Sequence, residues 1–326
     1  MAGGTDDRAR KAFSECLTET LHGKDLELVS PLRTLDEGVT GYVFDLVSLR
    51  DNIQADRLQS TTIPIQHAIS ETEQEVQKLI KTSLHPLPVG KPRVVHSALS
   101  PHEILRLIRD VGIDLFDAHW AQRAADIGIA LDFRFPVVEV ELNCPGPLRC
   151  ASGKQNLGHN LFDVTYAHDH SRLASCFLDA NSSQTSAPDT ICPCGACSPR
   201  APPNHIVHNS VDAIGTGPQG VGDVQTPFTR AYIHHLLHTH EMSSHTLLAM
   251  HNLSVLDAFF AGIRDVLGGP DAANTFALEI ERFVATYDEQ MDVFTQAHGA
   301  WARVERERGK GRLSRDKSDS TDLAVV

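Results

Sequence analysis

The sequence contains no run of about 18 apolar residues, the length that a membrane-spanning helix needs, although 41% of its 326 residues are hydrophobic. We therefore expect no membrane-spanning segment. The first residues, Met1 to Asp7, lack the apolar core of a secretory signal and also lack the Arg-rich, acid-poor composition of a transit peptide. These absences favour a cytoplasmic protein.

Positive charge is also scarce. The chain carries 29 Lys and Arg residues against 42 Asp and Glu residues, which gives a net charge of -13 at pH 7. A surface of this balance does not attract polyanions as a whole, so any contact with nucleic acid must use a local basic patch or the surface of a partner.

Cysteines are few, but they are unevenly placed. Three of the seven lie in the segment Cys192-Pro-Cys-Gly-Ala-Cys197, and in a cytosolic chain such a cluster indicates metal binding rather than disulfide bonds. Three thiolates on one tight turn can supply three corners of a zinc tetrahedron. The alternative is three unliganded or oxidised thiols. The remaining four are expected to be free, buried thiols: Cys16, Cys144, Cys150 and Cys176.

A fourth zinc ligand must come from elsewhere, and spacing alone does not choose among the 18 histidines. A histidine would close the coordination shell, which is typical of a structural ion rather than one that activates water. A second metal site in the histidine-rich segment 234–245 is less favoured than a polar helix face with satisfied imidazoles.

Strands and helices alternate through the first third of the chain, as in a parallel α/β sheet or a (β/α) barrel. Apolar periodicity and cap residues predict helices at 5–21, 70–84 and 100–112, and strands at 41–47, 91–97 and 113–117. Only about three strands are evident, whereas a closed barrel of this type has eight. The fold class is therefore predicted as α/β, and the chain either holds part of a TIM-type barrel or forms an incomplete one; the resemblance described below implies the C-terminal part.

The rest of the chain changes character. Loops and short strands are predicted for 135–227, followed by helices at 229–250, 252–267 and 272–294. Residues 198–225 offer no apolar face that could offset the entropy of ordering them. We divide the chain into a partial barrel (1–135), a zinc-binding region with C-terminal helices (136–300), in which 198–225 is a disordered insertion, and a disordered tail (301–326).

The cysteine segment, together with Phe228-Thr-Arg-Ala-Tyr-Ile-His-His-Leu236, Glu241-Met242 and Met250-His-Asn-Leu253, resembles the zinc-binding region of the tRNA-guanine transglycosylases, the queuine tRNA-ribosyltransferase family. The resemblance singles out His251 as the fourth ligand of one structural Zn²⁺ per subunit, beside Cys192, Cys194 and Cys197. It implies a zinc-binding subdomain inserted into the barrel.

The resemblance extends upstream over most of residues 2–290 and follows the later strands of the family's TIM-type barrel, as in Pro86-Leu-Pro-Val-Gly-Lys-Pro-Arg93 and Gly112-Ile-Asp-Leu-Phe-Asp117. The family's N-terminal half, with its general-base aspartate, has no counterpart in this sequence. In catalytic members an aspartate attacks the ribose and releases guanine. Asp117 matches the position of that nucleophile.

The surroundings of Asp117 differ from the catalytic pattern. Ala118-His-Trp-Ala-Gln-Arg123 stands where catalytic members have Cys-x-x-Pro-Thr-Arg, and Phe44-Asp-Leu-Val-Ser-Leu49 replaces a glycine-rich segment that lines the base pocket. Asp117 can instead serve as a helix cap or as a hydrogen-bonding residue at the end of a strand. We expect no catalytic residue in this chain.

These differences resemble the accessory subunit of the heterodimeric eukaryotic enzyme. The resemblance implies a non-catalytic partner of a catalytic queuine tRNA-ribosyltransferase subunit, contacting tRNA through the complex during exchange of guanine for queuine at wobble position 34 of tRNAs with GUN anticodons. The alternatives are an active transglycosylase that uses Asp117 and a zinc module that serves only protein interaction.

Two further expectations follow for the segment after the cysteines. The resemblance implies dimerisation through the zinc-proximal helices, including the face of Tyr232 and Leu236. Arg230 either contacts a tRNA phosphate or caps a backbone carbonyl.

Overall fold

The computed structural model describes residues 3–60, 65–137, 146–175, 192–199 and 226–308. The chain divides into two compact units, Met1–Trp120 and Ala121–Val326, and each is described by itself. Both units combine helices with a small sheet, so the α/β class is confirmed, whereas the described strands leave the barrel a prediction.

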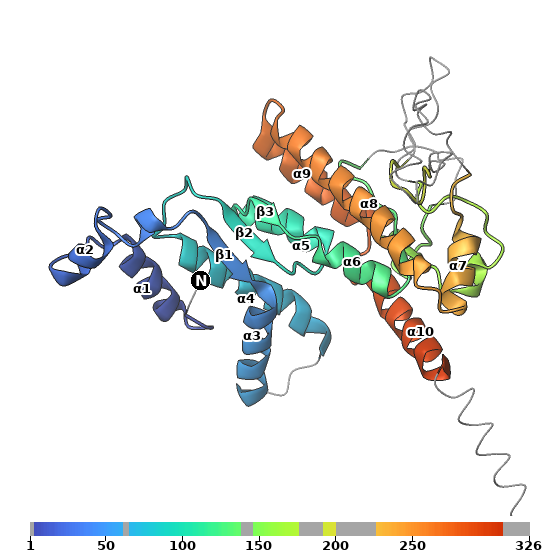
Figure 1. The fold of residues 1–326 in the computed structure, drawn as a ribbon, viewed down its shortest axis with the longest axis horizontal. Helices are drawn as coiled ribbons and strands as arrows, with labels where there is room; N and C mark the ends of the chain where they lie inside the picture. Colours follow the sequence, from blue (N-terminus) through green and yellow to red (C-terminus); the bar gives the residue numbers. More distant parts are fainter. Residues whose placement is uncertain (1–2, 61–64, 138–145, 176–191, 200–225, 309–326) are drawn as a thin grey trace, which may run out of the picture. The chain divides into compact units, whose positions relative to one another are not determined.

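The first unit is built on a parallel sheet of three strands in the order β1 (Tyr42–Asp45), β2 (Arg93–His96) and β3 (Leu115–Phe116) (Figure 1). All three predicted strands are therefore present, each shorter than its predicted range. The register aligns Tyr42 with Arg93 and Asp45 with His96. The carboxyl ends of β1 and β2 therefore lie side by side, with Asp117 following the end of β3.

The described helices of this unit are α1 (Asp7–Thr18), α2 (Lys24–Val29), α3 (Leu46–Ser60), α4 (Ile65–Leu84) and α5 (Pro101–Arg106), the last continued by a π-helical turn at Leu107–Val111. Tyr42, Phe44 and Val95 point from the strands into a core shared with Leu79 and Ile80 of α4. The cap predicted for α5 is present, because the Ser100 side chain accepts a hydrogen bond from the amide of Glu103 at 3.1 Å.

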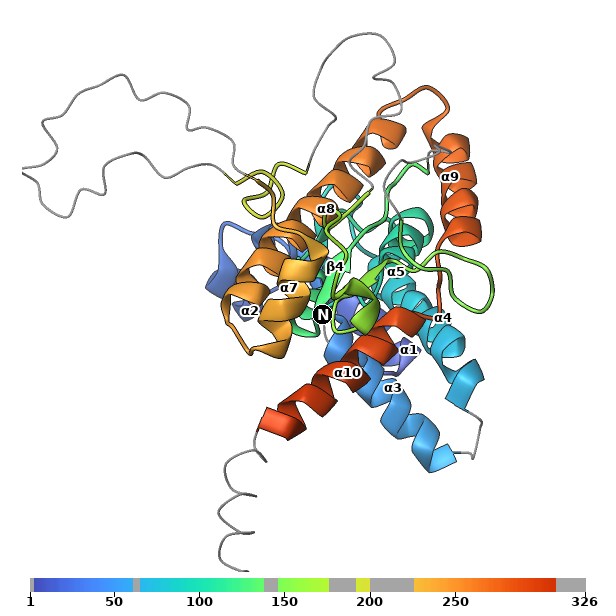
Figure 2. The ribbon, with the colours of Figure 1, turned by 90° about the vertical axis from the view of Figure 1, so that its right-hand side faces the viewer.

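The second unit has a two-stranded antiparallel sheet, β4 (Ile129–Leu131) with β5 (Gly158–Asn160). Around it lie α6 (His119–Asp126), which begins just before the unit, α7 (Arg230–His238), α8 (Ser243–Leu267), α9 (Ala272–Thr286) and α10 (Asp292–Arg308). Figure 2 shows α8 passing beside β4, and α8 also packs against α7 and α9. Its buried face positions the candidate site.

Aromatic rings fill the core beside α8 and α9. The ring of Phe133 lies edge-on to those of Phe259 and Phe283, with centroids 5.5 and 6.1 Å apart. Such edge-to-face pairs contribute about 0.5–1.5 kcal/mol beyond the burial of their area. This core fixes the chain just after β4 against both helices.

The helix boundaries of the second unit differ from the predicted ones. The break predicted at residue 251 lies instead at 239–242, where His240 has a positive φ of 59°. His251 is therefore inside a continuous α8 and not at a helix end. The helix predicted for 272–294 ends at Thr286, and α10 extends to Arg308, beyond the predicted start of the tail at 301.

Two predicted regions fall largely outside the described residues. These are the insertion at 198–225, of which only Ser198 and Pro199 are described, and residues 309–326 of the predicted tail. Among the described helices, α8 reaches the length and hydropathy of a membrane span. Length and composition are weak arguments here, because α8 buries polar side chains such as His251 and Asn252 within the unit.

Candidate metal centre

The three predicted cysteine ligands lie on one short turn of the second unit. Cys192, Cys194 and Cys197 are 3%, 7% and 4% exposed. The amide of Cys197 donates a hydrogen bond to Sγ of Cys194 at 3.3 Å, and the hydroxyl of Ser198 donates to the carbonyl of Cys192 at 2.9 Å. The turn therefore directs all three sulfur atoms to one side.

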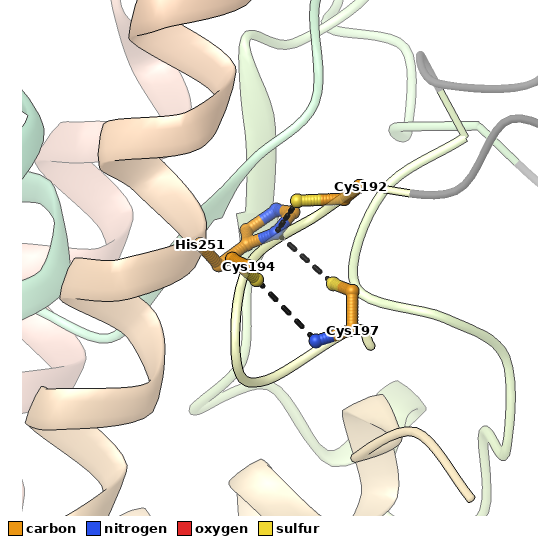
Figure 3. A group of neighbouring side chains, drawn as sticks. All are labelled: Cys192, Cys194, Cys197 and His251. Carbon is orange, nitrogen blue, oxygen red and sulfur yellow. Dashed lines mark hydrogen bonds between the residues drawn. The ribbon is translucent and has the colours of Figure 1, made fainter. Parts of the chain in front are cut away.

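His251 completes the group from α8. Figure 3 shows its ring facing the three sulfur atoms from the helix, and the residue is fully buried. Its Nδ1 atom lies 3.3 Å from Sγ of Cys197 and 3.6 Å from Sγ of Cys192. The four potential ligand atoms all lie within 4.8 Å of one another. The structure thus brings together the four predicted ligands.

The spacing fits a tetrahedral zinc ion. Zinc bonds of about 2.3 Å to sulfur and about 2.0 Å to nitrogen, at the tetrahedral angle, place sulfur and nitrogen about 3.6 Å apart. The two distances from Nδ1 of His251, 3.3 and 3.6 Å, agree with this value. A donor set of three thiolates and one imidazole is also typical of structural zinc.

A hydrogen bond determines which imidazole nitrogen is available. Nε2 of His251 lies 2.9 Å from the carbonyl oxygen of Leu131 on β4. A carbonyl only accepts, so Nε2 carries the proton and Nδ1 presents its lone pair to the cysteines. Metal-binding histidines are commonly oriented by such a bond from the second nitrogen.

The thiols of Cys194 and Cys197 differ in acidity. The pKa of Cys194 is lowered because its thiolate accepts hydrogen bonds from Cys192 and Cys197. The pKa of Cys197 is raised by its hydrogen bonds to Cys192 and Cys194, by burial and by their negative charge. Burial lowers the pKa of His251, but Cys192 and Cys194 outweigh it and raise the pKa to about 9. Without a cation Nδ1 therefore also holds a proton near pH 7, and binding of a metal would release that proton. A divalent cation would offset this concentration of negative charge.

Asn252, next to the histidine ligand, binds the same edge of β4 as His251 does. Its amide oxygen accepts from the Leu131 N–H at 2.9 Å, and its amide nitrogen donates to the carbonyls of Ile129 at 2.9 Å and Ala121 at 3.2 Å. An amide side chain here satisfies backbone groups that a neighbouring strand would otherwise satisfy. No role was predicted for Asn252 from the sequence, where its only signal is its place beside His251.

The histidine-rich segment supports the simpler interpretation. Nδ1 of His234 lies 2.8 Å from the carbonyl oxygen of Leu161, and Nε2 of His238 lies 3.2 Å from that of Phe162. Both imidazoles are therefore satisfied by backbone. Among the described residues, the group of three cysteines and His251 is the one with metal-binding geometry.

Arg230 is 1% exposed, so its guanidinium is not available to a tRNA phosphate. It forms an ion pair with Asp169 at 3.2 Å and lies 3.9 Å from a carboxylate oxygen of Asp132. These acidic partners, of which Asp132 is buried and Asp169 half-buried, and the histidine His159 that accompanies Asp132 were not predicted from the sequence. They lie in apolar or loop segments that carry no recognisable motif.

Asp117 lies at the carboxyl end of the first unit's sheet. Its Oδ2 atom accepts a hydrogen bond from the Ser97 amide at 2.9 Å and lies 3.3 Å from Nδ1 of His96. Its Oδ1 atom lies 3.4 Å from the amide of His119. Both carboxylate oxygens are thus engaged, which agrees with the alternative prediction that Asp117 is a hydrogen-bonding residue at the end of a strand.

Of the two residues predicted for the dimerisation face, one is exposed and the other is buried. Tyr232 is 44% exposed and stacks on Phe228, whereas Leu236 is 6% exposed and belongs to the core of its own chain. Leu236 therefore forms no part of an exposed surface on α7.

Four cysteines outside the cluster were predicted to be free and buried. Cys16 is exposed and Cys150 is half-buried, so both are free but neither is fully buried. Cys144 and Cys176 lie outside the described residues.

Comparison with known proteins gives a consistent family match. The family model described as queuine tRNA-ribosyltransferase matches residues 50–213 and 221–289, which is more than half of the chain. The match includes all four residues of the candidate metal centre and Asp117.

Individual relatives carry one recurring name, queuine tRNA-ribosyltransferase accessory subunit 2. The protein of this name from Ixodes scapularis is 27% identical over 269 residues, covering 78% of this chain and 52% of the relative. The one from Schizosaccharomyces pombe is 27% identical, covering 67% and 37%, and the one from Homo sapiens is 25% identical, covering 58% and 40%. The chain spans about half or less of the length of these relatives.

Proposed function

The chain belongs to the queuine tRNA-ribosyltransferase family, and from that membership we propose that it acts as a non-catalytic accessory subunit of the tRNA-modifying enzyme. In this proposal it pairs in the cytoplasm with a catalytic subunit, which exchanges guanine for queuine at the wobble position of tRNA. The names of its relatives support the accessory role.

The state of the Asp117 carboxylate is the observation that carries this proposal. A carboxylate nucleophile must share an electron pair with the ribose carbon. In this structure both carboxylate oxygens of Asp117 are instead engaged within the fold, Oδ2 by the amide of Ser97 with His96 alongside, and Oδ1 by the amide of His119.

Asp117 also has an evident structural task. Ser97 has a positive φ of 64°, a strained conformation for a residue with a side chain. The carboxylate of Asp117 accepts a hydrogen bond from the amide of Ser97, and the guanidinium of Arg50 donates to the carbonyl of Ser97 at 2.9 Å. Arg50 is in turn paired with Glu103 of α5. The carboxylate therefore stabilises the turn between β2 and α5.

The segment after β1 supports the same conclusion. α3 begins at Leu46, immediately after β1 ends at Asp45, and Asp45 caps it by accepting a hydrogen bond from the amide of Val47 at 2.9 Å. Phe44, Leu46 and Leu49 are 3%, 0% and 4% exposed. A capped helix with buried anchors replaces the open, glycine-rich backbone that would let a planar base approach closely.

The metal centre supports a structural Zn²⁺, held by the three cysteines and His251. A closed set of four protein ligands would leave no position for water or substrate. When bound, the ion would supply cross-linking: it would tie the cysteine turn to α8 and, through Leu131, to β4.

A partly apolar surface next to the metal centre fits partner binding. We define the zinc-side patch as Tyr232, Met250 and Leu253, which are 44%, 37% and 37% exposed. Met250 lies against Gly195 of the cysteine turn, and Tyr232 stacks on Phe228, whose amide donates to the carbonyl of Ala196 at 3.0 Å. Exposed aromatic and Met residues of this kind are enriched in protein interfaces.

Base exchange measured with and without a catalytic queuine tRNA-ribosyltransferase subunit tests the proposal. The isolated chain should release no guanine from tRNA, and it should co-purify with the catalytic subunit. Tyr232→Asp should weaken that association, whereas Leu278→Asp, at a residue 57% exposed on α9, should not.

The alternative, an active transglycosylase that uses Asp117, predicts a different result. Asp117 is partly exposed, with 27% of its side chain accessible at the carboxyl end of a parallel sheet, where such sheets bind ligands. Guanine release by the isolated chain that is lost in Asp117→Asn would establish this alternative and reject the accessory role. In the accessory role, Asp117→Asn leaves the activity of the assembled complex unchanged.

A further inference from the structure

Strand β4 is held along its outer edge by α8 rather than by another strand. His251 donates to the carbonyl of Leu131, while Asn252 binds the N–H of Leu131 and the carbonyl of Ile129, each at 2.9 Å. The orientation of the His251 ring therefore depends on the position of one backbone residue, Leu131.

The residue after Leu131 is a buried aspartate. Asp132 is 2% exposed, and its carboxylate accepts hydrogen bonds from the amide and the hydroxyl of Ser175, both at 2.9 Å. Nε2 of His159 lies 2.9 Å from the same carboxylate, and the guanidinium of Arg230 lies 3.9 Å away. Asp132 thus joins β4 to β5, to the segment around Ser175 and to the start of α7.

The surroundings of this carboxylate favour its ionised form. Burial acts to raise the pKa of Asp132, but hydrogen bonds from His159 and from Ser175 outweigh it and hold the pKa below its usual value. Removing one member of such a network leaves the others buried without a partner, which is costly. Asp132 therefore constrains the backbone at the end of β4.

The same aspartate is linked to the cysteine side of the metal centre. Arg230 begins α7, two residues after Phe228. The amide of Phe228 donates to the carbonyl of Ala196, which lies between Cys194 and Cys197. One buried charge is therefore connected both to the strand that orients His251 and to the helix start that follows the cysteine turn.

We propose that Asp132 is a positioning residue for the metal centre: it fixes Leu131 and the start of α7 so that the imidazole of His251 and the cysteine turn meet in tetrahedral geometry. The proposal rests on zinc occupancy of that centre, which is part of the proposed function. It predicts that zinc affinity depends on a residue that does not contact the ion, as is common for groups behind metal ligands.

Asp132→Asn in the full chain is the test, because it removes the charge and keeps the shape. Asp288→Asn is the matched control: Asp288 is 3% exposed in the same unit and accepts from the amides of Gln290 and Asp292, away from β4. Zinc affinity is measured by competition with a chromophoric chelator. The absorption spectrum of the Co²⁺-substituted protein reports the ligand geometry directly.

We expect Asp132→Asn to lower zinc affinity by about tenfold or more and to change the Co²⁺ spectrum. Asp288→Asn should bind zinc as the unaltered chain does, even if its unfolding temperature falls. Equal affinity and an identical Co²⁺ spectrum for a folded Asp132→Asn would overturn the proposal while leaving the zinc site intact. If the unaltered chain binds no zinc, both proposals fail.

Ser175→Ala decides the matter if Asp132→Asn does not fold. It removes the hydroxyl that donates to Asp132 and leaves the charge and His159 in place. A smaller loss of zinc affinity in the same direction supports the positioning role. Unchanged affinity with an unchanged Co²⁺ spectrum rejects it.

Discussion

The carbonyl oxygen of Leu131 determines which nitrogen of His251 faces the cysteines. The two atoms that bond, Nε2 and the carbonyl oxygen, lie 2.9 Å apart, and the opposite nitrogen lies 3.3 Å from Sγ of Cys197. A backbone carbonyl thus sets the tautomer of a fully buried imidazole. Zinc binding and the integrity of β4 should consequently depend on each other.

Replacing Cys197 by alanine should abolish stoichiometric zinc binding, because three remaining ligands leave the coordination shell open. The variant should also unfold at a lower temperature, since the ion no longer links the cysteine turn to α8. Metal analysis of the purified protein and circular dichroism check both points. Cys150→Ser, at a half-buried cysteine outside the cluster, should retain one zinc; equal zinc content in the two variants would contradict the assignment.

Replacing Asn252 by alanine should destabilise the second unit by about 3 kcal/mol or more, because several buried backbone groups lose their partners. The groups are the N–H of Leu131 and the carbonyls of Ile129 and Ala121. Urea denaturation measures the loss. Asn274→Ala, which removes an exposed bond to Asp271, should change stability by less than about 0.5 kcal/mol.

Two glycine-to-alanine substitutions should change the free energy of unfolding in opposite directions. A Cβ on Gly262 of α8 would clash with the carbonyl oxygen of Phe135, so Gly262→Ala should destabilise the protein by at least about 2 kcal/mol. Gly299 of α10 has no such neighbour within 4 Å, so Gly299→Ala should stabilise by up to about 1 kcal/mol. Urea denaturation compares them, and a stabilised Gly262→Ala would show that α8 does not pack as described.

Acid should destabilise the second unit partly through His159. Burial lowers the pKa of His159, and its bond to Asp132 only partly opposes this. The unfolded chain therefore takes up a proton near pH 6.5 while the folded chain does not, so stability falls as pH drops through that value. Asp132, whose pKa is also lowered, extends the loss to lower pH.

His159→Gln should accordingly reduce the slope of unfolding free energy against pH between about 7 and 5.5, the range in which an unfolded histidine takes up its proton. The measurement is made in excess zinc, so that protonation of the cysteines contributes as little as possible. His235→Gln is the comparison, because His235 is an exposed residue of α7. Equal slopes for the two variants would show that His159 is not the group responsible.

The parts of the fold that could be predicted from sequence were those with local signals. The strands near 43, 94 and 115 follow apolar runs, and the start of α5 follows from Ser100 and Pro101. The boundary between α7 and α8 could not be placed from the sequence. Apolar residues lie on both sides of residue 251, the predicted break, so the apolar pattern does not mark where α8 begins. The helix α3 was missed for a related reason: its amphipathic pattern is weak.

The candidate site shows the same division. Three ligands could be predicted from the spacing of Cys192, Cys194 and Cys197, and family resemblance supplied His251. Asp132 and His159 could not be found, since they are 27 residues apart in sequence and meet only when β4 pairs with β5. Buried polar contacts of this kind depend on tertiary structure, which local patterns do not encode.

The hydrogen bond between Phe228 and Ala196 brings both ends of the intervening stretch to one place, 3.0 Å apart between amide nitrogen and carbonyl oxygen. The entropy of closing a loop between two fixed points generally grows only with the logarithm of its length, about 0.6 kcal/mol for each doubling. The number of residues between Cys197 and Phe228 can therefore change during evolution at little thermodynamic cost to the ligands before and after them. The length of this stretch can vary, whereas the positions of Cys197 and His251 in the metal centre cannot.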